Sequence, residues 1–317
     1  MIIILLVQRL GCDNILSTVS SAHLGWLLGA VVIFLLSTLI GVFQWQILLK
    51  NRGIPLLFWR SFRLYIIGMF FNNFLLGGIV GDALKVASIR SRDGKGKAGL
   101  AATFLDRFAG LWAMSGFAIA GSIILLHHGA ITSGKIYTAI VALFATFLLF
   151  AGILAFLIFK PFQRLFFYLL DRLPLKKASN LREIISEMLI EAHDFHILLS
   201  VGLLSVFIQF LRIGVHIMVA QSLGLLTAQN FHYFFIFVPI IAMLMTLPLP
   251  FGVREAFGGT LFALAGFQQD ASYVMGFLAS LVGLAASCTG GLFYIIDRTV
   301  STREKHEQTV NSHTASQ

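Results

Sequence analysis

Acidic residues and cysteines are scarce in this chain. Of its 317 residues only 14 are Asp or Glu and 2 are Cys, and charged residues of both signs make up 12%. Cys12 and Cys288 are too few for a disulfide framework or a thiolate metal site. A soluble domain of this size needs more charged residues than this to form its hydrated surface. The composition therefore excludes a soluble protein.

Apolar residues take the place of the missing charge. They make up 58% of the chain, 31 residues are Phe, and the mean hydropathy is +0.88. This predicts an all-α polytopic protein of the inner membrane. Of the 23 basic residues, 18 lie in the stretches 50–63, 85–97, 160–182 and 298–305. Basic flanks face the cytoplasm, where anionic lipid is the expected partner, and nucleic-acid binding is not expected.

The apolar segments divide the chain into about six spanning helices. Met1–Val7 is read as the end of a shortened first helix, and the other spans are Leu24–Leu49, Gly99–Leu126, Ile136–Phe159, Ile197–Leu223 and Ala271–Ile296. Residues 161–196 alternate apolar and charged side chains at helical spacing, which predicts an amphipathic elbow on the cytoplasmic face. We therefore expect one membrane domain, 1–297, followed by a polar cytoplasmic tail, 298–317.

Two further apolar segments are too short to span. Leu64–Leu76 runs into Gly77, Gly78 and Gly81, and Phe234–Leu247 runs into Pro248, Pro250 and Gly252. Each would reach about 20 Å as a helix, against a hydrocarbon core of about 30 Å. The first segment has basic residues on both sides, which places both of its ends at the cytoplasmic face, whereas the second segment must begin and end at the outer face. We therefore predict two re-entrant hairpins that enter from opposite faces. An inverted repeat would produce this pattern, although orientation alone can mimic it.

Several charges lie within or beside these apolar segments, where an unpaired charge is costly. The sequence offers two interpretations, ion pairs that fix helix register or a polar cavity for a charged headgroup. Asp82 lies one helical turn before Lys85, and Arg107 on the next helix is its other expected partner. Arg254 is the preferred headgroup ligand, because its guanidinium fork suits phosphate oxygens. The candidate substrate-binding residues are Asp82, Lys85, Asp106, Arg107, Arg212, Arg254 and Glu255.

Three blocks in this order resemble the flippase-like lysylphosphatidylglycerol synthase transmembrane family. They are Gly77–Lys85, Thr103–Gly110 and Leu247–Ala256, and the resemblance extends from about Leu24 to Asp297. It implies a membrane domain that moves a charged phospholipid or related lipid between leaflets. Some members of the family also carry a soluble aminoacyl-transferase domain that makes the lipid, and no such domain is expected in this chain.

The leading hypothesis is a lipid translocase, not an enzyme, that holds a headgroup at the two broken-helix tips. We expect no cofactor and no metal, and the chain has no Walker A pattern for ATP hydrolysis. One alternative is an intramembrane enzyme acting on a lipid or polyprenyl phosphate, with Asp82, Asp106 or Glu255 as acid or base. Another is a scaffold of a lipid-modifying complex. A lipid-synthesising protein is the expected protein partner.

Overall fold

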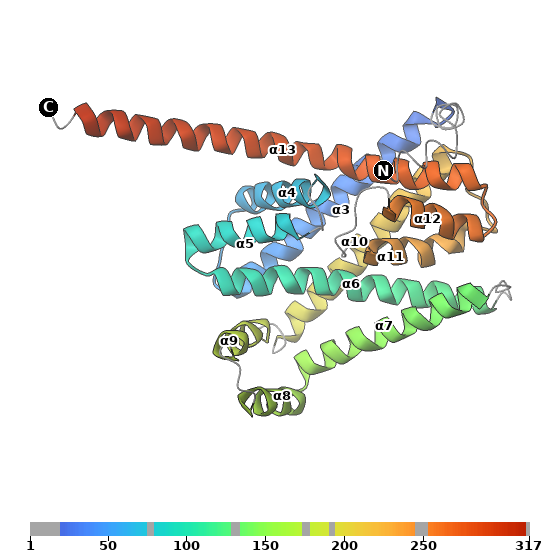
Figure 1. Ribbon diagram of the computed structural model, residues 1–317, viewed down its shortest axis with the longest axis horizontal. Helices are drawn as coiled ribbons and strands as arrows, with labels where there is room; N and C mark the ends of the chain where they lie inside the picture. Colours follow the sequence, from blue (N-terminus) through green and yellow to red (C-terminus); the bar gives the residue numbers. More distant parts are fainter. Residues whose placement is uncertain are drawn as a thin grey trace.

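The computed structural model describes residues 20–74, 79–127, 134–172, 178–189, 194–244 and 253–314, and within these ranges every regular element is a helix (Figure 1). Among the described residues, five helices are long and apolar enough to cross a membrane. They are α3 (Leu24–Asn51), α6 (Gly96–His127), α7 (Gly134–Ile158), α10 (Phe195–Ser222) and α13 (Gln269–Thr314). The all-α polytopic prediction is thereby confirmed. The shortened helix expected at Met1–Val7 lies outside the described residues.

Four of the shorter helices form two pairs at opposite ends of the molecule (Figure 1). In one pair α4 (Phe58–Phe74) packs against α5 (Val80–Asp93). In the other, the 3-10 turn η2 (Phe231–Tyr233) leads into α11 (Phe234–Leu244), which packs against α12 (Val253–Leu264). The breaks between partners, 75–78 and 245–252, lie outside the described residues. Entry from opposite faces and an inverted repeat therefore stay predictions.

Helix α4 is longer than the sequence indicated. It begins at Phe58 instead of Leu64, so Arg60 and Arg63 belong to the helix and not to a loop. Likewise Lys85, Arg90 and Arg92 lie within α5. Arg60 Nη2 lies 2.8 Å from Asp93 Oδ2, which ties the first turn of α4 to the last turn of α5. The basic flanks of the apolar segment Leu64–Leu76 therefore lie within helices.

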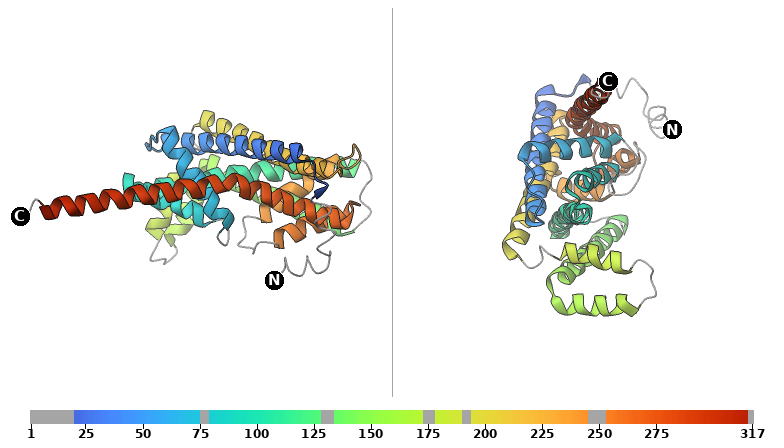
Figure 2. Two further views of the ribbon diagram at one scale, coloured as in Figure 1. Left: turned by 90° about the horizontal axis from the view of Figure 1, so that it is seen from above. Right: turned by 90° about the vertical axis from the view of Figure 1, so that its left-hand side faces the viewer.

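The elbow region forms two helices, α8 (Lys160–Arg172) and α9 (Ala178–Met188). They lie together at one edge of the bundle (Figure 2). Along α8 the apolar side chains at helical spacing stay exposed, namely Phe162, Leu165, Phe166 and Leu169. Such a face is typical of a helix that lies in a membrane interface. The elbow ends before the predicted residue 196, because α10 already begins at Phe195, where the Asp194 side chain accepts hydrogen bonds from the first helical amides.

Glycines let three helices pack backbone to backbone. A Cβ at Gly81 of α5 would collide with the carbonyl oxygen of Gly68 in α4. A Cβ at Gly290 of α13 would collide with the carbonyl oxygen of Ile66, also in α4. Helix α4 therefore packs closely against both α5 and α13. Helix α3 packs most extensively along α10.

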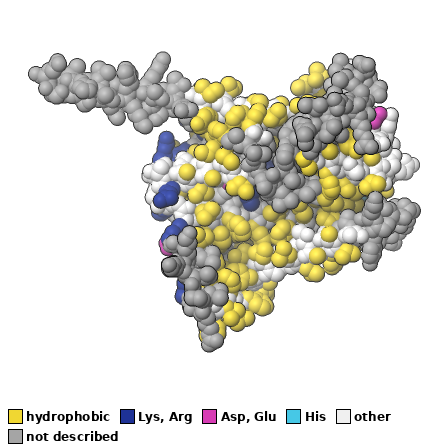
Figure 3. Space-filling view, viewed as in Figure 1, with side chains coloured by type: hydrophobic (Ala, Val, Ile, Leu, Met, Phe, Trp, Pro, Cys, Tyr) yellow, Lys and Arg dark blue, Asp and Glu magenta, His cyan; other side chains and the backbone are white. Residues whose placement is uncertain are grey.

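The surface follows the pattern of a membrane protein. Hydrophobic side chains cover the middle of the visible face, and Lys and Arg gather at the end that carries α5 and α9 (Figure 3). Large apolar residues of the spanning helices are exposed, for example Val32, Leu149 and Leu203. The fold therefore has an apolar belt with one strongly basic end. Beyond the belt α13 continues as a helix to Thr314, so the predicted tail begins as part of that helix.

Candidate functional site

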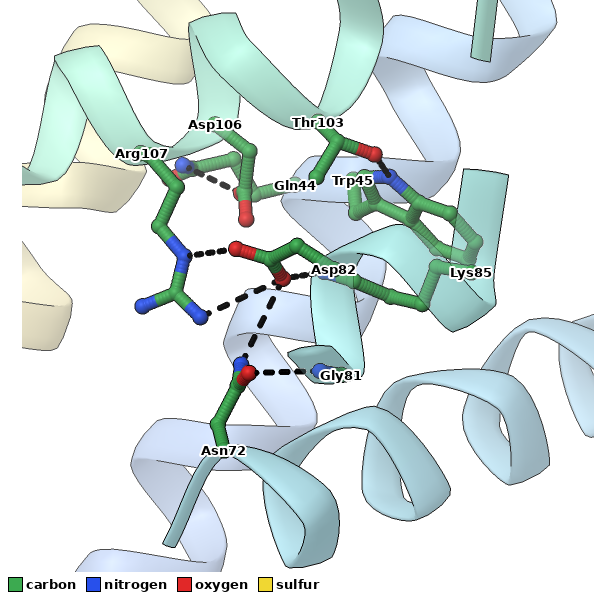
Figure 4. A network of polar contacts seen from close by, with 9 residues as sticks. All are labelled: Gln44, Trp45, Asn72, Gly81, Asp82, Lys85, Thr103, Asp106 and Arg107. Carbon is green, nitrogen blue, oxygen red and sulfur yellow. Dashed lines mark hydrogen bonds and ion pairs between the residues drawn. The ribbon is translucent and has the colours of Figure 1, made fainter. Parts of the chain in front are cut away.

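Asp82 is the centre of a polar cluster inside the bundle (Figure 4). It lies in the first turn of α5, where negative charge is favoured by the unpaired amides of a helix start. Its Oδ1 is 2.9 Å from Lys85 Nζ, and its Oδ2 accepts a 2.8 Å hydrogen bond from Arg107 Nε on α6. Arg107 Nη2 donates a second bond to Oδ1 at 3.2 Å. The carboxylate is therefore shared by two cations.

Asn72 fixes the position of this acid. Its Oδ1 accepts a 2.8 Å hydrogen bond from the backbone N–H of Gly81, and its Nδ2 lies 3.5 Å from Asp82 Oδ1. The last turn of α4 thus holds the first turn of α5. Burial alone would raise the pKa of the Asp82 carboxyl, but Lys85 and Arg107 outweigh burial and hold that pKa below its ordinary value.

Lys85 is almost completely enclosed, with a side chain only 4% exposed. Its Nζ lies 5.1 Å from the ring centroid of Trp45 and 4.7 Å from that of Tyr65. Trp45 is held in turn by a 3.1 Å hydrogen bond from its Nε1 to Thr103 Oγ1. The ammonium therefore has a carboxylate on one side and aromatic faces on others, which together offset its burial.

A second polar chain joins three spanning helices. Gln44 of α3 donates from Nε2 to Asp106 Oδ1 at 2.9 Å, and Ser205 of α10 donates from Oγ to Gln44 Oε1 at 2.9 Å. All three side chains are buried. Asp106 comes directly before Arg107 on α6, so this chain borders the Asp82 cluster. It fixes the rotation of α3, α6 and α10 relative to one another.

Arg212 extends the polar region along α10. Ser205, Gln209, Arg212 and His216 follow one another at spacings of four, three and four, so they share one helical face. Gln209 lies against Gly110 of α6. Arg212 is close enough to Asp106, Arg107 and Tyr65 to interact with them electrostatically. Its Nε is buried and has no hydrogen-bond partner within the described part of the chain.

The structure divides the predicted site residues into groups. Asp82, Lys85, Asp106 and Arg107 lie together with Arg212 beside them, whereas Glu255 is buried elsewhere and accepts a 2.6 Å hydrogen bond from Ser280 Oγ of α13. Gly81 is described and forms the close contact with α4. The Arg254 side chain and the tip residues Gly77, Gly78, Pro248, Pro250 and Gly252 lie outside what is described. Among the described residues, no three His, Cys, Asp or Glu side chains gather as a group that could hold a metal ion.

Residues 1–288 match the family described as the lysylphosphatidylglycerol synthase TM region. The chain belongs to this family. Membership confirms the resemblance carried by the three sequence blocks, and it ties the chain to a lipid-related function in the membrane. No curated protein and no solved structure gives a match.

Several members of the cluster were not predicted from the sequence. Gln44, Asn72 and Ser205 were not among the predicted site residues. Gln44 carried a usable signal, because an amide inside the apolar span Leu24–Leu49 needs a partner. Asn72 carried another, since it comes just before the glycine break. A small hydroxyl such as Ser205 gives no comparable signal, because it can bond within its own helix.

Proposed function

We propose that this protein moves a lipid with a charged headgroup between the two leaflets of the inner membrane. The observation that carries the proposal is the ionic cluster of Asp82, Lys85, Asp106 and Arg107. It forms where a helix too short to span meets the apolar belt. Charged side chains within a membrane usually mark a substrate or ion pathway, because placing them there costs free energy.

Arg107 is the member of the cluster that a ligand can reach. Its side chain is 47% exposed, against 17% for Asp82. Asp82 occupies Arg107 Nε and Nη2, which leaves Nη1 without a hydrogen-bond partner among the described residues. A lipid phosphate could accept from that nitrogen while its acyl chains stay beside the exposed apolar side chains of the belt. This division of roles gives the headgroup a polar niche without removing the tails from the membrane.

Arg254 and Glu255 at the start of α12 would form a second headgroup contact. The pair α4 and α5 and the pair α11 and α12 would enter the membrane as re-entrant hairpins from opposite faces. The elbow helices α8 and α9 would rest on anionic lipid at the cytoplasmic face, with the C-terminus on that side. The chain would act without catalysis or cofactor, and a partner protein would make the lipid.

Reconstituted vesicles test the proposal. Fluorescent phospholipids are placed in one leaflet, and their movement is followed by quenching from outside. We expect the wild-type chain to accelerate movement and Asp82→Asn to abolish most of that acceleration. Asp93→Asn is the matched control, because it removes a carboxylate from a surface ion pair with Arg60 and should leave transport unchanged. Equal transport by wild type and Asp82→Asn would remove the cluster from the mechanism.

A further inference from the structure

Four helices of the first half of the chain pack together as four helices of the second half do. Exchanging α3 with α10, α4 with α11, α5 with α12 and α6 with α13 reproduces the packing. Helix α6 packs on α10 as α13 packs on α3, and α13 packs on α4 as α6 packs on α11. Helix α5 packs against both α4 and α6, just as α12 packs against both α11 and α13. The two sets of helices are therefore related by an approximate two-fold axis, and α7, α8 and α9 connect them.

One polar contact in each half occupies an equivalent position. Asp82 of α5 meets Arg107 of α6, and Glu255 of α12 meets Ser280 of α13. In both pairs the partner lies 25 residues after the acid. A single offset of 173 residues, the difference between 82 and 255, relates the two acids and also their two partners. The same offset separates the starts of α5 and α12 and the starts of α6 and α13. Glu255 and Ser280 are therefore the counterpart of Asp82 and Arg107.

The two contacts differ in how closely the helices around them approach. A Cβ at Gly276 of α13 would lie 3.0 Å from the carbonyl oxygen of Glu255, so the backbones of α12 and α13 almost touch. The equivalent residue of α6 is Thr103, which has the Cβ that Gly276 lacks. Glu255 is only 5% exposed, whereas the side chain of Arg107 is 47% exposed. The molecule is therefore closed where α12 meets α13 and more open where α5 meets α6.

We infer that Glu255 and Ser280 form an outer gate of the transport pathway. Asp82 and Arg107 form the inner gate, and the two gates open in turn. The inference rests on the proposed function and adds Ser280 as a positioning residue, which donates a 2.6 Å hydrogen bond to the Glu255 carboxylate. A hydrogen bond to a charged acceptor is about twice as strong as a neutral one, so it stabilises the closed gate. Rocking of two inverted halves against each other gives alternating access in many transporters, and here it would separate α12 from α13 while α5 closes on α6.

Distances between spin labels on the full chain in lipid vesicles test the gates separately from transport. In a chain freed of its native cysteines, one pair of labels replaces Leu84 and Phe104 and reports the inner gate. A second pair replaces Phe257 and Phe277, which are the equivalent positions of α12 and α13, and reports the outer gate. We expect Ser280→Ala to raise the population with the longer outer distance about tenfold, which corresponds to about 1.4 kcal/mol, and to shorten the inner distance. Ser280→Thr keeps the hydroxyl and should behave as the wild type does.

The matched control is Ser287→Ala, which should change neither distance, because the Ser287 hydroxyl donates to the carbonyl of Leu284 in its own helix. Unchanged distances in Ser280→Ala, or lengthening of both distances together, overturn the inference. If Ser280→Ala does not fold, Glu255→Gln decides, since it keeps the side-chain volume and removes the charge, and unchanged distances in that variant overturn the inference. Distances that shift as expected in a chain that moves no lipid would refute the proposed function and leave the paired gates standing. Lipid movement with unchanged distances would do the reverse.

Discussion

Replacing Asp82 by asparagine should destabilise the protein through the cations it leaves behind. Lys85 is buried, so losing its carboxylate falls in the class of broken buried ion pairs, which costs about 3–5 kcal/mol. The introduced asparagine could still accept one hydrogen bond from the ammonium, which returns part of that loss. Arg107 is half-exposed, so its contribution is about 0–1 kcal/mol. Together these effects give an expected loss of about 3 kcal/mol in the free energy of unfolding.

A second substitution separates charge from packing. Lys85→Met added to Asp82→Asn removes the unpaired ammonium at nearly constant volume, and neutral replacements of buried pairs are often tolerated. The double variant should therefore regain at least half of the lost stability while transport stays low. Denaturant titration in mixed micelles, followed by circular dichroism, gives the stabilities, and the vesicle assay gives the transport. The reasoning is refuted if Asp82→Asn lies within about 1 kcal/mol of wild type, or if the double variant is less stable than the single one.

Three further predictions concern packing, topology and the second helix pair. Gly81→Ala should prevent stable folding because of the carbonyl of α4, whereas Gly116→Ala, with open space around it, should leave the unfolding midpoint unchanged; equal midpoints would contradict the close packing. In a chain otherwise free of cysteine, a cysteine at Ser91 and one within residues 172–178 should react only with reagent on the cytoplasmic side, and outside labelling would overturn the topology. Arg254→Lys should weaken lipid movement and Arg254→Ala should nearly abolish it, measured in vesicles, while normal transport by both would place the headgroup elsewhere.

The spanning helices could be predicted because hydropathy and length act locally. Ile197–Leu223 was expected and Phe195–Ser222 is observed, since a helix in lipid satisfies its own backbone and needs no distant partner. The ion pair of Asp82 and Lys85 could also be predicted from the sequence, because residues three apart share a helix face. Local pattern sufficed in both cases.

Contacts between helices were harder to predict. Whether Gln44 meets Asp106 depends on how α3 and α6 are rotated about their axes, and a uniformly apolar span such as α3 gives little indication of its rotation. The sequence favoured Arg254 over Arg212 as the headgroup ligand, because Arg254 follows a proline break that is visible in the sequence. The charged neighbours of Arg212 become apparent only when α4 and α6 are in place.

The glycine contacts of α4 have a consequence for motion. Backbones that touch at Gly81 and at Gly290 leave no layer of side chains in which one helix could slide past another. We therefore expect α5, α4 and α13 to move as one rigid body, with the hinge or shear surface against α6 and the α3–α10 pair. The ion pair between Asp82 and Arg107 crosses that surface, so we expect it to break if the two bodies separate. Spin labels on α4 and α13 would then keep a constant distance when lipid is added, while labels on α5 and α6 would report the separation.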